Sequence, residues 1–420
     1  MGSQFLRLVY FLVLTLIMIA CTGCGGSTSS TPSTPNVVPV PERITFSGSG
    51  DLGIFDPSIT RDTSSGQLWM SYSSVNTSPN YASTLYWSVS LRLAFSDDNG
   101  ISWQDAGLAV SPAVERTDFG PMTEAHPTGS IPANTKGIWQ SETSSLIYDA
   151  HPSTPANERW KLIWFQYFHG DVTSYFADYS WISMKMASTP AGLAAAIPVK
   201  LFGGAGLQAD NSITGSPVYA PIGGVPVIQL NTGLTQVGGG PDITELNLCI
   251  FTEPGLHATN STIYMTIYCA DASTVPLTEY LVHFRCHSPC TMASAASWEY
   301  LGRVLSPTDA QAATGDHHYQ APALVEKNGK TYLVVTPVDT TSGSRYNGCR
   351  VYEFTDINNN QLLRNNGALV EVARIDGDIN THNGACAGFS ELSGGILLSQ
   401  FGTIGTADAF KIYKSQVSLP

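Results

Sequence analysis

Three carboxylates could act together in catalysis, although long stretches of chain separate them. Asp56, Glu142 and Glu245 each stand at the opening of a run of residues typical of a β-strand. Carboxylates that share a pocket repel one another, which raises the pKa of at least one and lets it hold a proton while another stays ionised. Glycoside hydrolysis uses such a pair, one as general acid and one as base or nucleophile. We therefore take these three residues as candidate catalytic residues.

Residues near the openings of these and two similar runs could bind a substrate. Trp139, three residues before Glu142, could stack on a sugar ring, and Asp242, three residues before Glu245, could reach the same pocket. Each has a structural alternative, because tryptophans often pack between strands and an Asp that follows glycines and a proline often lies in a turn. The candidates for substrate binding are Trp139, Asp242, His318, Gln320 and Asn383.

A unit of three strands that repeats five times beyond residue 41 must position these residues. Opening strands are expected at 56–59, 142–146, 245–248, 320–324 and 382–385. Apolar second strands are expected at 68–72, 162–165, 263–268, 332–335 and 396–399, and alternating third strands at 91–96, 181–188, 280–285, 351–355 and 410–415. Only residues 191–196 look helical.

Small antiparallel sheets repeated around an axis form β-propellers, in which neighbouring sheets bury each other's faces. We therefore predict an all-β fold, a five-bladed β-propeller. The first strand of every blade lines the axis, so residues from distant openings converge at one mouth of the central channel. A β-sandwich is the structural alternative, but it does not explain the repeated openings.

Two segments resemble the five-bladed propeller glycoside hydrolases of the family 43 type, which include arabinanases, β-xylosidases and α-L-arabinofuranosidases. Phe55-Asp56-Pro57-Ser58-Ile59 is similar to their first-blade opening, and residues 320–333 (QAPALVEKNGKTYL) are similar to their strand-turn-strand pattern. In that family a blade 1 Asp is the base, a blade 2 Asp tunes the acid and a blade 3 Glu is the acid.

By position, the resemblance implies that Asp56 is the base and Glu245 the acid. The chain departs from the pattern because Glu142 stands where the family has Asp, and Leu-Asn instead of Ala-Pro follows Glu245. Glu142 is therefore an alternative proton donor. A last-blade His helps some members to hold a central cation, which implies a structural metal ion, such as calcium, at His382. No other cofactor is expected.

A second motif resembles the Asp-box of sialidases. Residues 96–103 (SDDNGISW) match S-x-D-x-G-x-[ST]-W. We interpret it as a turn between outer strands, in which Asp and Gly fix the turn and Trp packs between strands. Sialidases also need three arginines for the substrate carboxylate, and apart from Arg7 only Arg43, Arg61 and Arg92 occur in the first 100 residues. A six-bladed, sialidase-like hydrolase is therefore the alternative enzyme, and a non-catalytic binding propeller is a third possibility.

Composition narrows the partners of this 420-residue chain. It is 43% hydrophobic and 13% charged, with a net charge of −13. Disordered chains are less hydrophobic and more charged, so disorder is excluded as the main state. No Lys/Arg cluster occurs, which argues against binding to nucleic acid or anionic lipid headgroups. We expect a monomer whose partner is a neutral carbohydrate.

The first residues have the pattern of an export signal. Arg7 precedes the apolar run 8–20 (LVYFLVLTLIMIA), which is short for a membrane span. Small residues and Cys21 and Cys24 follow, as in bacterial lipoprotein signals, where a Cys is lipidated. We favour Cys21, with Cys24 or an ordinary cleaved signal as alternatives.

The export signal also sets the expected domain boundaries and location. The expected organisation is a signal segment at 1–24, a Gly/Ser/Thr/Pro-rich tether at 25–41 and one propeller domain at 42–420. The tether has no hydrophobic pattern and could not pack. A lipid on the Cys would anchor the exported protein at the bacterial cell envelope.

Six cysteines remain beyond the signal, and an even number in an oxidising compartment suggests disulfides. Cys249 and Cys269 lie in neighbouring strand-like runs, and Cys286 and Cys290 could close a small loop, which leaves Cys349 with Cys386. Metal binding by Cys286, His287 and Cys290 is the alternative, but no second Cys pair lies nearby to complete a tetrahedral site.

Overall fold

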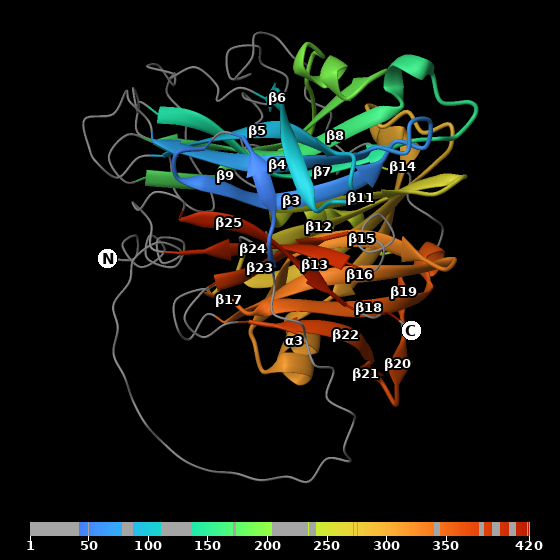
Figure 1. Ribbon diagram of the computed structural model, residues 1–420. Coiled ribbons are helices and arrows are strands. Elements are labelled where there is room, and N and C mark those ends of the chain that lie inside the picture. The colour runs from blue at the N-terminus through green and yellow to red at the C-terminus, as the bar shows by residue number, and fades with distance from the viewer. Residues whose placement is uncertain are drawn as a thin grey trace.

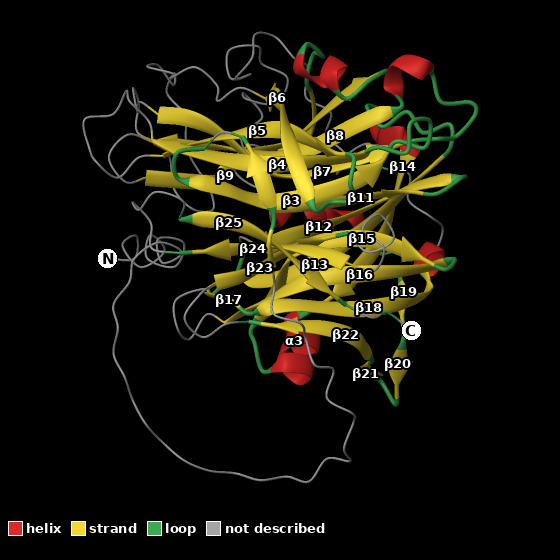
Figure 2. Ribbon diagram, in the orientation of Figure 1, coloured by secondary structure: helices red, strands yellow, loops and turns green. Residues whose placement is uncertain are grey.

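A computed structural model of the chain is nearly all-β, with a few short helices (Figures 1 and 2). It describes residues 42–48, 50–77, 87–110, 137–170, 174–203, 234, 241–271, 273–274, 276–339, 345–377, 382–388, 395–402, 409–417 and 419. Among these residues, no helix is long and apolar enough to cross a membrane. The signal and tether expected at 1–41 lie outside this part of the chain.

Most strands belong to five antiparallel meanders, which we call meanders 1 to 5. The first and the fifth are joined into one nine-stranded sheet by a parallel pairing at Gly53 and Phe410. Meander 1 is β3 (Gly53–Arg61), β4 (Leu68–Thr77), β5 (Trp87–Ser96) and β6 (Ser102–Val110). Meander 2 is β7 (Gly137–Tyr148), β8 (Trp160–Gly170), β9 (Ser174–Ala187) and β10 (Val199–Gly203). Meander 3 is β11 (Cys249–Ala258), β12 (Thr262–Asp271), β13 (Thr278–His287) and β14 (Trp298–Leu305).

Meander 4 is β15 (His318–Lys327), β16 (Lys330–Asp339), β18 (Gly348–Asp356) and β22 (Glu371–Asp376). Short strands extend it: β17 (Arg345–Tyr346) pairs with β16, and β19 (Gln361–Leu362) with β18. Meander 5 is β23 (His382–Ala387), β24 (Gly395–Phe401) and β25 (Phe410–Gln416). The small pair β20 (Arg364–Asn365) and β21 (Ala368–Leu369) lies apart.

The chain's first strands join its last ones. β1 (Glu42–Arg43) pairs antiparallel with β25 and so becomes the fourth strand of meander 5, while β2 (Thr45–Ser47) pairs with β6. The first strands of the meanders contact one another in the order β3, β7, β11, β15 and β23, and β23 returns to contact β3. In Figure 1 the blue strands of meander 1 accordingly lie near the red strands of meander 5.

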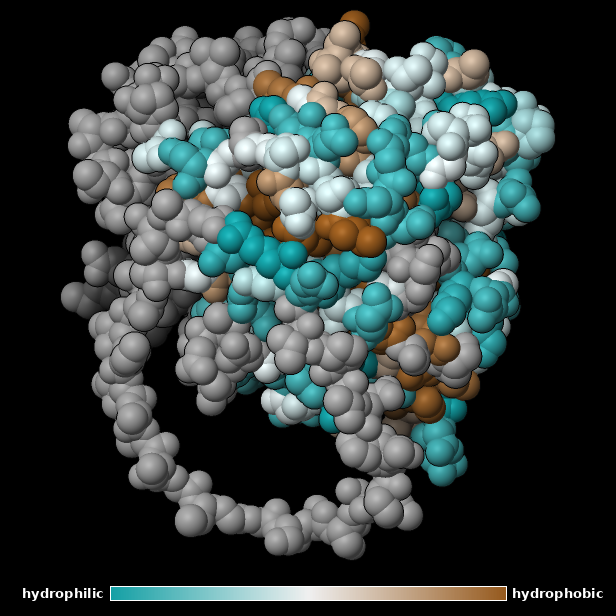
Figure 3. All heavy atoms as spheres, in the orientation of Figure 1, coloured by the Kyte–Doolittle hydropathy of each residue, from teal (hydrophilic) through white to brown (hydrophobic). Residues whose placement is uncertain are grey.

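The core lies between the meanders. One cluster joins meanders 2 and 3, and includes Ile163, Phe165, Met265 and Trp298; others join meander 1 to 2, 3 to 4 and 4 to 5. Because both faces of a meander are buried in this way, the second strands are mainly apolar, as expected, and polar residues within them such as Ser71 and Lys161 are buried too. Hydrophilic residues predominate on the face seen in Figure 3, with hydrophobic residues in separate patches.

All three predicted disulfides are confirmed: Cys249–Cys269, Cys286–Cys290 and Cys349–Cys386. The first joins adjacent strands of meander 3, and the last ties β18 to β23 across two meanders. The cysteines of the alternative metal site are therefore paired with each other.

The Asp-box forms the predicted turn between β5 and β6. Asp98 Oδ1 accepts hydrogen bonds from the backbone N–H groups of Ile101 and Ser102, which help to lower its pKa to about 2. Trp103 is 1% exposed, and its Nε1–H donates to the carbonyl of Gly100. The motif thus stabilises an outer edge of meander 1.

The helices are short and partly unforeseen. η3 (Ala191–Ala194) lies where helical structure was expected, and η2 (Ala156–Glu158), η5 (Ala295–Ser297) and η6 (Ile357–Asn359) are single turns. The α-helix α3 (Pro307–Thr314) was not expected. Its sequence signal is a capping box between Ser306 and Asp309, with Pro307 in the first turn and Gly315 in the left-handed conformation after the end.

The expected opening strand at 245–248 needs correction. Those residues belong to the 3-10 helix η4 (Ile243–Leu248), and the first strand of meander 3 begins at Cys249. Asp242 caps η4, because its side chain accepts a hydrogen bond from the backbone N–H of Thr244. The true opening is therefore displaced along the sequence.

Candidate active site

Every first strand carries a β-bulge at which one non-glycine residue adopts a positive φ. These residues are Asp56 (φ 50°), Thr143 (47°), Glu253 (54°), Ala321 (46°) and Ala385 (48°). At each bulge the strand has one residue more than its partner strand, as between Phe55 and Ser58. Such bulges redirect side chains, and non-glycine residues in this conformation are strained and concentrate at functional sites.

The bulge residues are held by the preceding meander. The N–H of Asp56 donates to Ser399 Oγ (2.8 Å), and that of Thr143 to Ser73 Oγ (3.1 Å). The N–H of Ala385 donates to Thr336 Oγ1 (2.8 Å). A bulge removes a backbone N–H from the strand ladder, so these side-chain acceptors satisfy groups that would otherwise be buried without a partner.

Asp56 is 5% exposed and accepts two hydroxyl hydrogen bonds on Oδ2. Thr143 Oγ1 donates to it at 3.0 Å and Ser73 Oγ at 3.4 Å. Burial raises the pKa of Asp56 well above its usual value, and the negative charges of Glu142 and Glu253 add to this effect, which the two hydroxyls oppose. Asp56 therefore shares its surroundings with two glutamates.

Glu142 precedes the bulge residue of meander 2 and is half-buried. Burial and the negative charge of Glu253 raise its pKa to about 8, against a hydrogen bond with Tyr167 that favours the ionised form. A carboxyl group with such a pKa keeps its proton at neutral pH, which is the property of a general acid.

Glu253 occupies the bulge of meander 3 and is held through both oxygens. The backbone N–H of Ala321 donates to Oε2 at 2.7 Å, and the Tyr346 hydroxyl donates to Oε1 at 2.9 Å. Burial raises the pKa of Glu253, but these two bonds lower it. The two donors therefore favour the ionised form and fix the orientation of the carboxylate.

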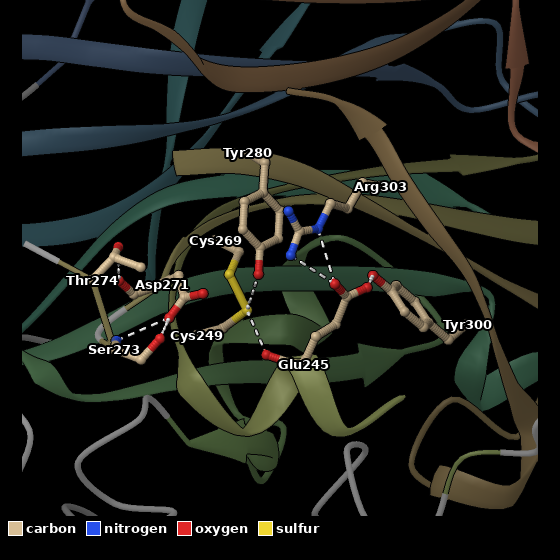
Figure 4. Close-up of a disulfide and its surroundings, with 9 residues drawn as sticks. All are labelled: Glu245, Cys249, Cys269, Asp271, Ser273, Thr274, Tyr280, Tyr300 and Arg303. Atoms are coloured by element: carbon tan, nitrogen blue, oxygen red, sulfur yellow. Dashed lines mark hydrogen bonds and ion pairs between the residues drawn. A yellow bond between two sulfur atoms is a disulfide. The ribbon is translucent and has the colours of Figure 1, made fainter. Parts of the chain in front are cut away.

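The structure thus brings Asp56 and Glu142 together, as expected from the sequence, but the third carboxylate is Glu253. Glu245, the expected third member, lies in η4 (Figure 4). Arg303 forms an ion pair with Glu245 Oε2 at 2.8 Å, and the Tyr300 hydroxyl donates to Oε1. Since η4 precedes β11, Glu245 lies outside the first strand and its bulge.

A sequence signal for Glu253 exists. Residues 252–256 (TEPGL) share with 55–59 (FDPSI) and 320–324 (QAPAL) a proline after the bulge residue, then a small and an aliphatic residue. Aligning the openings on this proline selects Glu253. Aligning them on the nearest carboxylate before an apolar run selected Glu245 instead.

Some of the expected substrate-binding residues lie in first strands near the bulges, and others do not. Gln320 immediately precedes the bulge of β15, and Asn383, 7% exposed, lies two residues before that of β23. His318 is buried, with Nδ1 2.8 Å from Glu279 Oε2. Asp242 is the cap of η4, away from the bulges. The side chain of Trp139 lies outside the part of the chain that the structure describes.

His382 begins β23, three residues before the bulge residue Ala385. Within the described residues, no three His, Cys, Asp or Glu side chains are grouped so that they could hold a metal ion. The cation that the family resemblance implies at His382 stays a prediction.

The early arginines are occupied elsewhere. Arg92 Nε donates to Asp105 at 3.0 Å, and Arg61 Nη2 donates to Asn99 at 3.3 Å in the Asp-box turn. Arg43 lies in β1, exposed. Arg92 and Arg61 are therefore held within meander 1, and Arg61 also lines a cavity of about 320 Å³ formed by the first strands.

Two cavities follow the axis defined by the first strands. A small one of about 40 Å³ is lined by bulge residues, including Asp56, Thr143, Ala321 and Ala385. A larger one of about 320 Å³ is lined by the later residues of the same strands. Residues of all five first strands line each cavity, so the bulges surround a common space.

The chain is similar to known proteins in its fold and not in its sequence. No family model matches the chain, and no curated protein matches it. An endo-arabinase from Bacteroides thetaiotaomicron VPI-5482 superposes with a TM-score of 0.43 at 12% identity, over 86% of this chain and 94% of that one. The Bacillus subtilis arabinanase Arb43A gives 0.44 at 9% identity, over 89% and 96%.

A family 117 glycoside hydrolase, Zg3597, from the marine bacterium Zobellia galactanivorans gives a TM-score of 0.46 at 10% identity, over 90% of this chain and 89% of that one. These superpositions are too loose to support an argument about activity, which rests on the residues of the site. The solved structures to which the chain is similar include family 43 glycoside hydrolases, the class that its sequence resembles.

Proposed function

We propose that this protein is a glycoside hydrolase that acts on a neutral glycan, with Glu142 as general acid and Asp56 as base or nucleophile. The observation that carries the proposal is the meeting of Asp56, Glu142 and Glu253 at one ring of bulges: burial raises the pKa of all three, and the charge of Glu253 further raises the pKa of Asp56 and of Glu142. Two carboxyl groups with different protonation states are what glycoside hydrolysis requires.

The proposed fold is a five-bladed propeller in which each meander is a blade. The cyclic contacts of the first strands and the pairing of β1 with β25 support closure of the ring. Closure explains why residues as distant as Asp56 and Ala385 line one cavity.

The roles follow from the hydrogen bonds. Burial raises the pKa of both carboxyl groups, but two hydroxyls donate to Asp56 and favour its ionised form, whereas Glu142, whose pKa the charge of Glu253 also raises, retains its proton. Glu142 would protonate the glycosidic oxygen as the bond to the sugar breaks. Asp56 would activate water or attack the sugar carbon, and the fixed charge of Glu253 would stabilise the positive charge that develops on the sugar.

In the resembled family the blade 3 residue is the acid and the blade 2 residue tunes its pKa, whereas here these two roles are exchanged. The blade 2 residue becomes the acid, and the blade 3 residue tunes its pKa. This assignment replaces the expected acid Glu245, which Arg303 and Tyr300 hold in η4.

A neutral substrate of the arabinose or xylose type is favoured by charge. Three carboxylates and a net charge of −13 repel an acidic sugar, and the early arginines are engaged at other places. His318, Gln320 and Asn383 remain proposed contacts to the sugar, because they lie in the first strands near the bulges.

A substrate screen with single variants tests the proposal. Aryl-glycosides, arabinan, xylan and sialosides would be offered to wild type, Asp56→Asn, Glu142→Gln and Glu253→Gln, with Glu245→Gln as the matched control. We expect hydrolysis of a neutral glycan, lowered at least 100-fold by Asp56→Asn and by Glu142→Gln and unchanged by Glu245→Gln.

Two results would contradict the assignment. Activity that survives both Asp56→Asn and Glu142→Gln would exclude their catalytic roles, and hydrolysis restricted to sialosides would favour the sialidase alternative. Glycan binding without any hydrolysis would indicate a binding propeller.

We further propose that the protein is exported and anchored through a lipid on Cys21 at the bacterial cell envelope. The signal pattern of residues 1–24 supports this proposal. Metabolic labelling with a palmitate analogue tests it: label should be lost in Cys21→Ser and kept in Cys24→Ser, and the reverse pattern would assign the lipid to Cys24.

A further inference from the structure

We propose that Tyr346 is a positioning residue of this site, which holds Glu253 ionised and in one orientation. The inference deepens the proposed function and rests on it, because it concerns what controls the proton of the general acid. The sequence had not suggested Tyr346, which lies in the two-residue strand β17 beside β16.

The hydroxyl of Tyr346 supplies the second of two hydrogen bonds to the carboxylate of Glu253. It donates to Oε1 at 2.9 Å, while the backbone N–H of Ala321 donates to Oε2 at 2.7 Å. With a donor on each oxygen, the carboxylate cannot rotate without losing a bond. Hydrogen bonds to a charged acceptor are stronger than neutral ones, so removal of the phenol hydroxyl should destabilise the ionised form.

The aromatic side chain of Tyr346 packs against meander 5. It packs edge-on against Phe401, with centroids 5.4 Å apart. It also lies so close to the backbone of β23 that a Cβ on Gly384 would be 2.8 Å from Tyr346 Cδ2 and 2.5 Å from Thr336 Cγ2. Gly384 therefore leaves room for the tyrosine, which spans from meander 5 to Glu253 in meander 3.

The hydroxyl of Tyr346 keeps its proton, and so remains a hydrogen-bond donor, at neutral pH. Burial raises the pKa of Tyr346 well above its usual value, and the charges of Glu253, Asp56 and Glu142 act in the same direction. The charges of all three carboxylates thus act on Tyr346, and its hydroxyl stays protonated when they ionise.

The remaining charged neighbours of Glu253 come from β13 and β15. His318 favours the charged form of Glu253, and Glu279, 2.8 Å from His318, opposes it. The Tyr268 hydroxyl donates to the other oxygen of Glu279. His318 and Glu279 therefore offset each other in part, which leaves Tyr346 and Ala321 as the direct donors to Glu253.

Replacement of Tyr346 by Phe should redistribute the proton of the site. Without the hydroxyl, Glu253 holds a proton more readily, and its charge repels that of Glu142 less. The pKa of Glu142 should then fall, so the alkaline limb of the activity profile should move to lower pH by about one unit. A merely structural tyrosine would change stability without moving this limb.

The titration can be followed without activity. Carboxyl-¹³C-labelled glutamate would report Glu142 in wild type and in Tyr346→Phe, with the signal assigned by Glu142→Gln. Tyr319→Phe is the matched control, because Tyr319 is a buried tyrosine of the same meander whose hydroxyl contacts Tyr352.

We expect a Glu142 midpoint near pH 8 in wild type and in Tyr319→Phe, and about one unit lower in Tyr346→Phe. An unchanged midpoint in folded Tyr346→Phe would overturn the inference. If the midpoint moves but no glycoside is hydrolysed, the proposed function fails and the role of Tyr346 in the carboxylate cluster stands.

Discussion

Thr143 Oγ1 donates a hydrogen bond to Asp56 Oδ2 at 3.0 Å, although 86 residues separate the two in the chain. Both are bulge residues of neighbouring first strands with positive φ. The contact links two strained backbone positions to the charge state of one carboxylate, and it leads to the first prediction.

Thr143→Val should raise the pKa of Asp56, because a donor to its charged form is lost. A base works only when ionised, so the acidic limb of the pH-rate profile should move to higher pH, by about one unit. Thr143→Ser keeps a hydroxyl and should restore the wild-type profile. A Thr143→Val profile that matches wild type would show that this hydroxyl does not control the base.

The raised pKa of Glu142 should make the free energy of unfolding depend on pH. The folded state binds a proton that the unfolded chain, with an ordinary Glu pKa near 4.5, releases, so the free energy of unfolding should fall as the pH rises from about 4.5 to about 8. Glu142→Gln removes this dependence and should stabilise the protein at pH 8 by up to about 4 kcal/mol, at about 1.4 kcal/mol per pKa unit. Urea unfolding at pH 5 and 8 measures it. Parallel pH dependence in both proteins would contradict the assignment.

Thr336 should contribute to stability through the bulge of the next meander. Its hydroxyl accepts the N–H of Ala385 at 2.8 Å, and Thr336→Val would leave that buried N–H without this acceptor, at a cost of about 1–3 kcal/mol. Thr355→Val is the control, because the exposed hydroxyl of Thr355 donates to the carbonyl of Gln361. Equal unfolding free energies for the two variants would show that the contact between meanders adds nothing.

His283 should make the protein acid-sensitive. It is buried between Tyr264 and Phe354, and burial lowers its pKa to about 3. The unfolded chain takes up a proton near pH 6.5 that the folded state refuses, so the free energy of unfolding should fall as the pH drops from about 6.5 to about 3.

His283→Phe should flatten this part of the stability profile, measured by urea unfolding at pH 4.5 and 7. His287→Gln is the control, since the His287 side chain is 57% exposed. A profile as steep in His283→Phe as in wild type would assign the acid sensitivity to other groups.

The disulfides should differ in their effect on stability. Cys349–Cys386 encloses 37 residues of sequence separation and joins two meanders, whereas Cys286–Cys290 spans only 4. Replacing the first pair by serine should cost about 3–4 kcal/mol in the loop-entropy account, and replacing the second should cost less. Denaturant unfolding of the two double variants compares them, and equal losses would contradict this account.

Local sequence determined a large part of this protein. Alternation and turn residues located the second and third strands of every meander, because those patterns depend on near neighbours. The Asp-box turn is likewise determined locally, since Asp98 bonds residues within five positions. Asp56 could be singled out because Asp-Pro at a strand opening is a short, recognisable pattern, and the spacing of the six cysteines with the strand order was enough to pair them.

The tertiary structure decided which carboxylates meet. Glu245 and Glu253 are both acidic residues before an apolar run. The proline after Glu253 matches the other openings, but the bulge register of β11 decides between the two: Glu253 lies at the bulge, while Glu245 lies in a 3-10 helix beside Arg303. Tyr346 could not be inferred, because its position depends on a two-residue strand and on the space left by Gly384. Such positions arise from packing between segments far apart in the chain, and no local pattern encodes them.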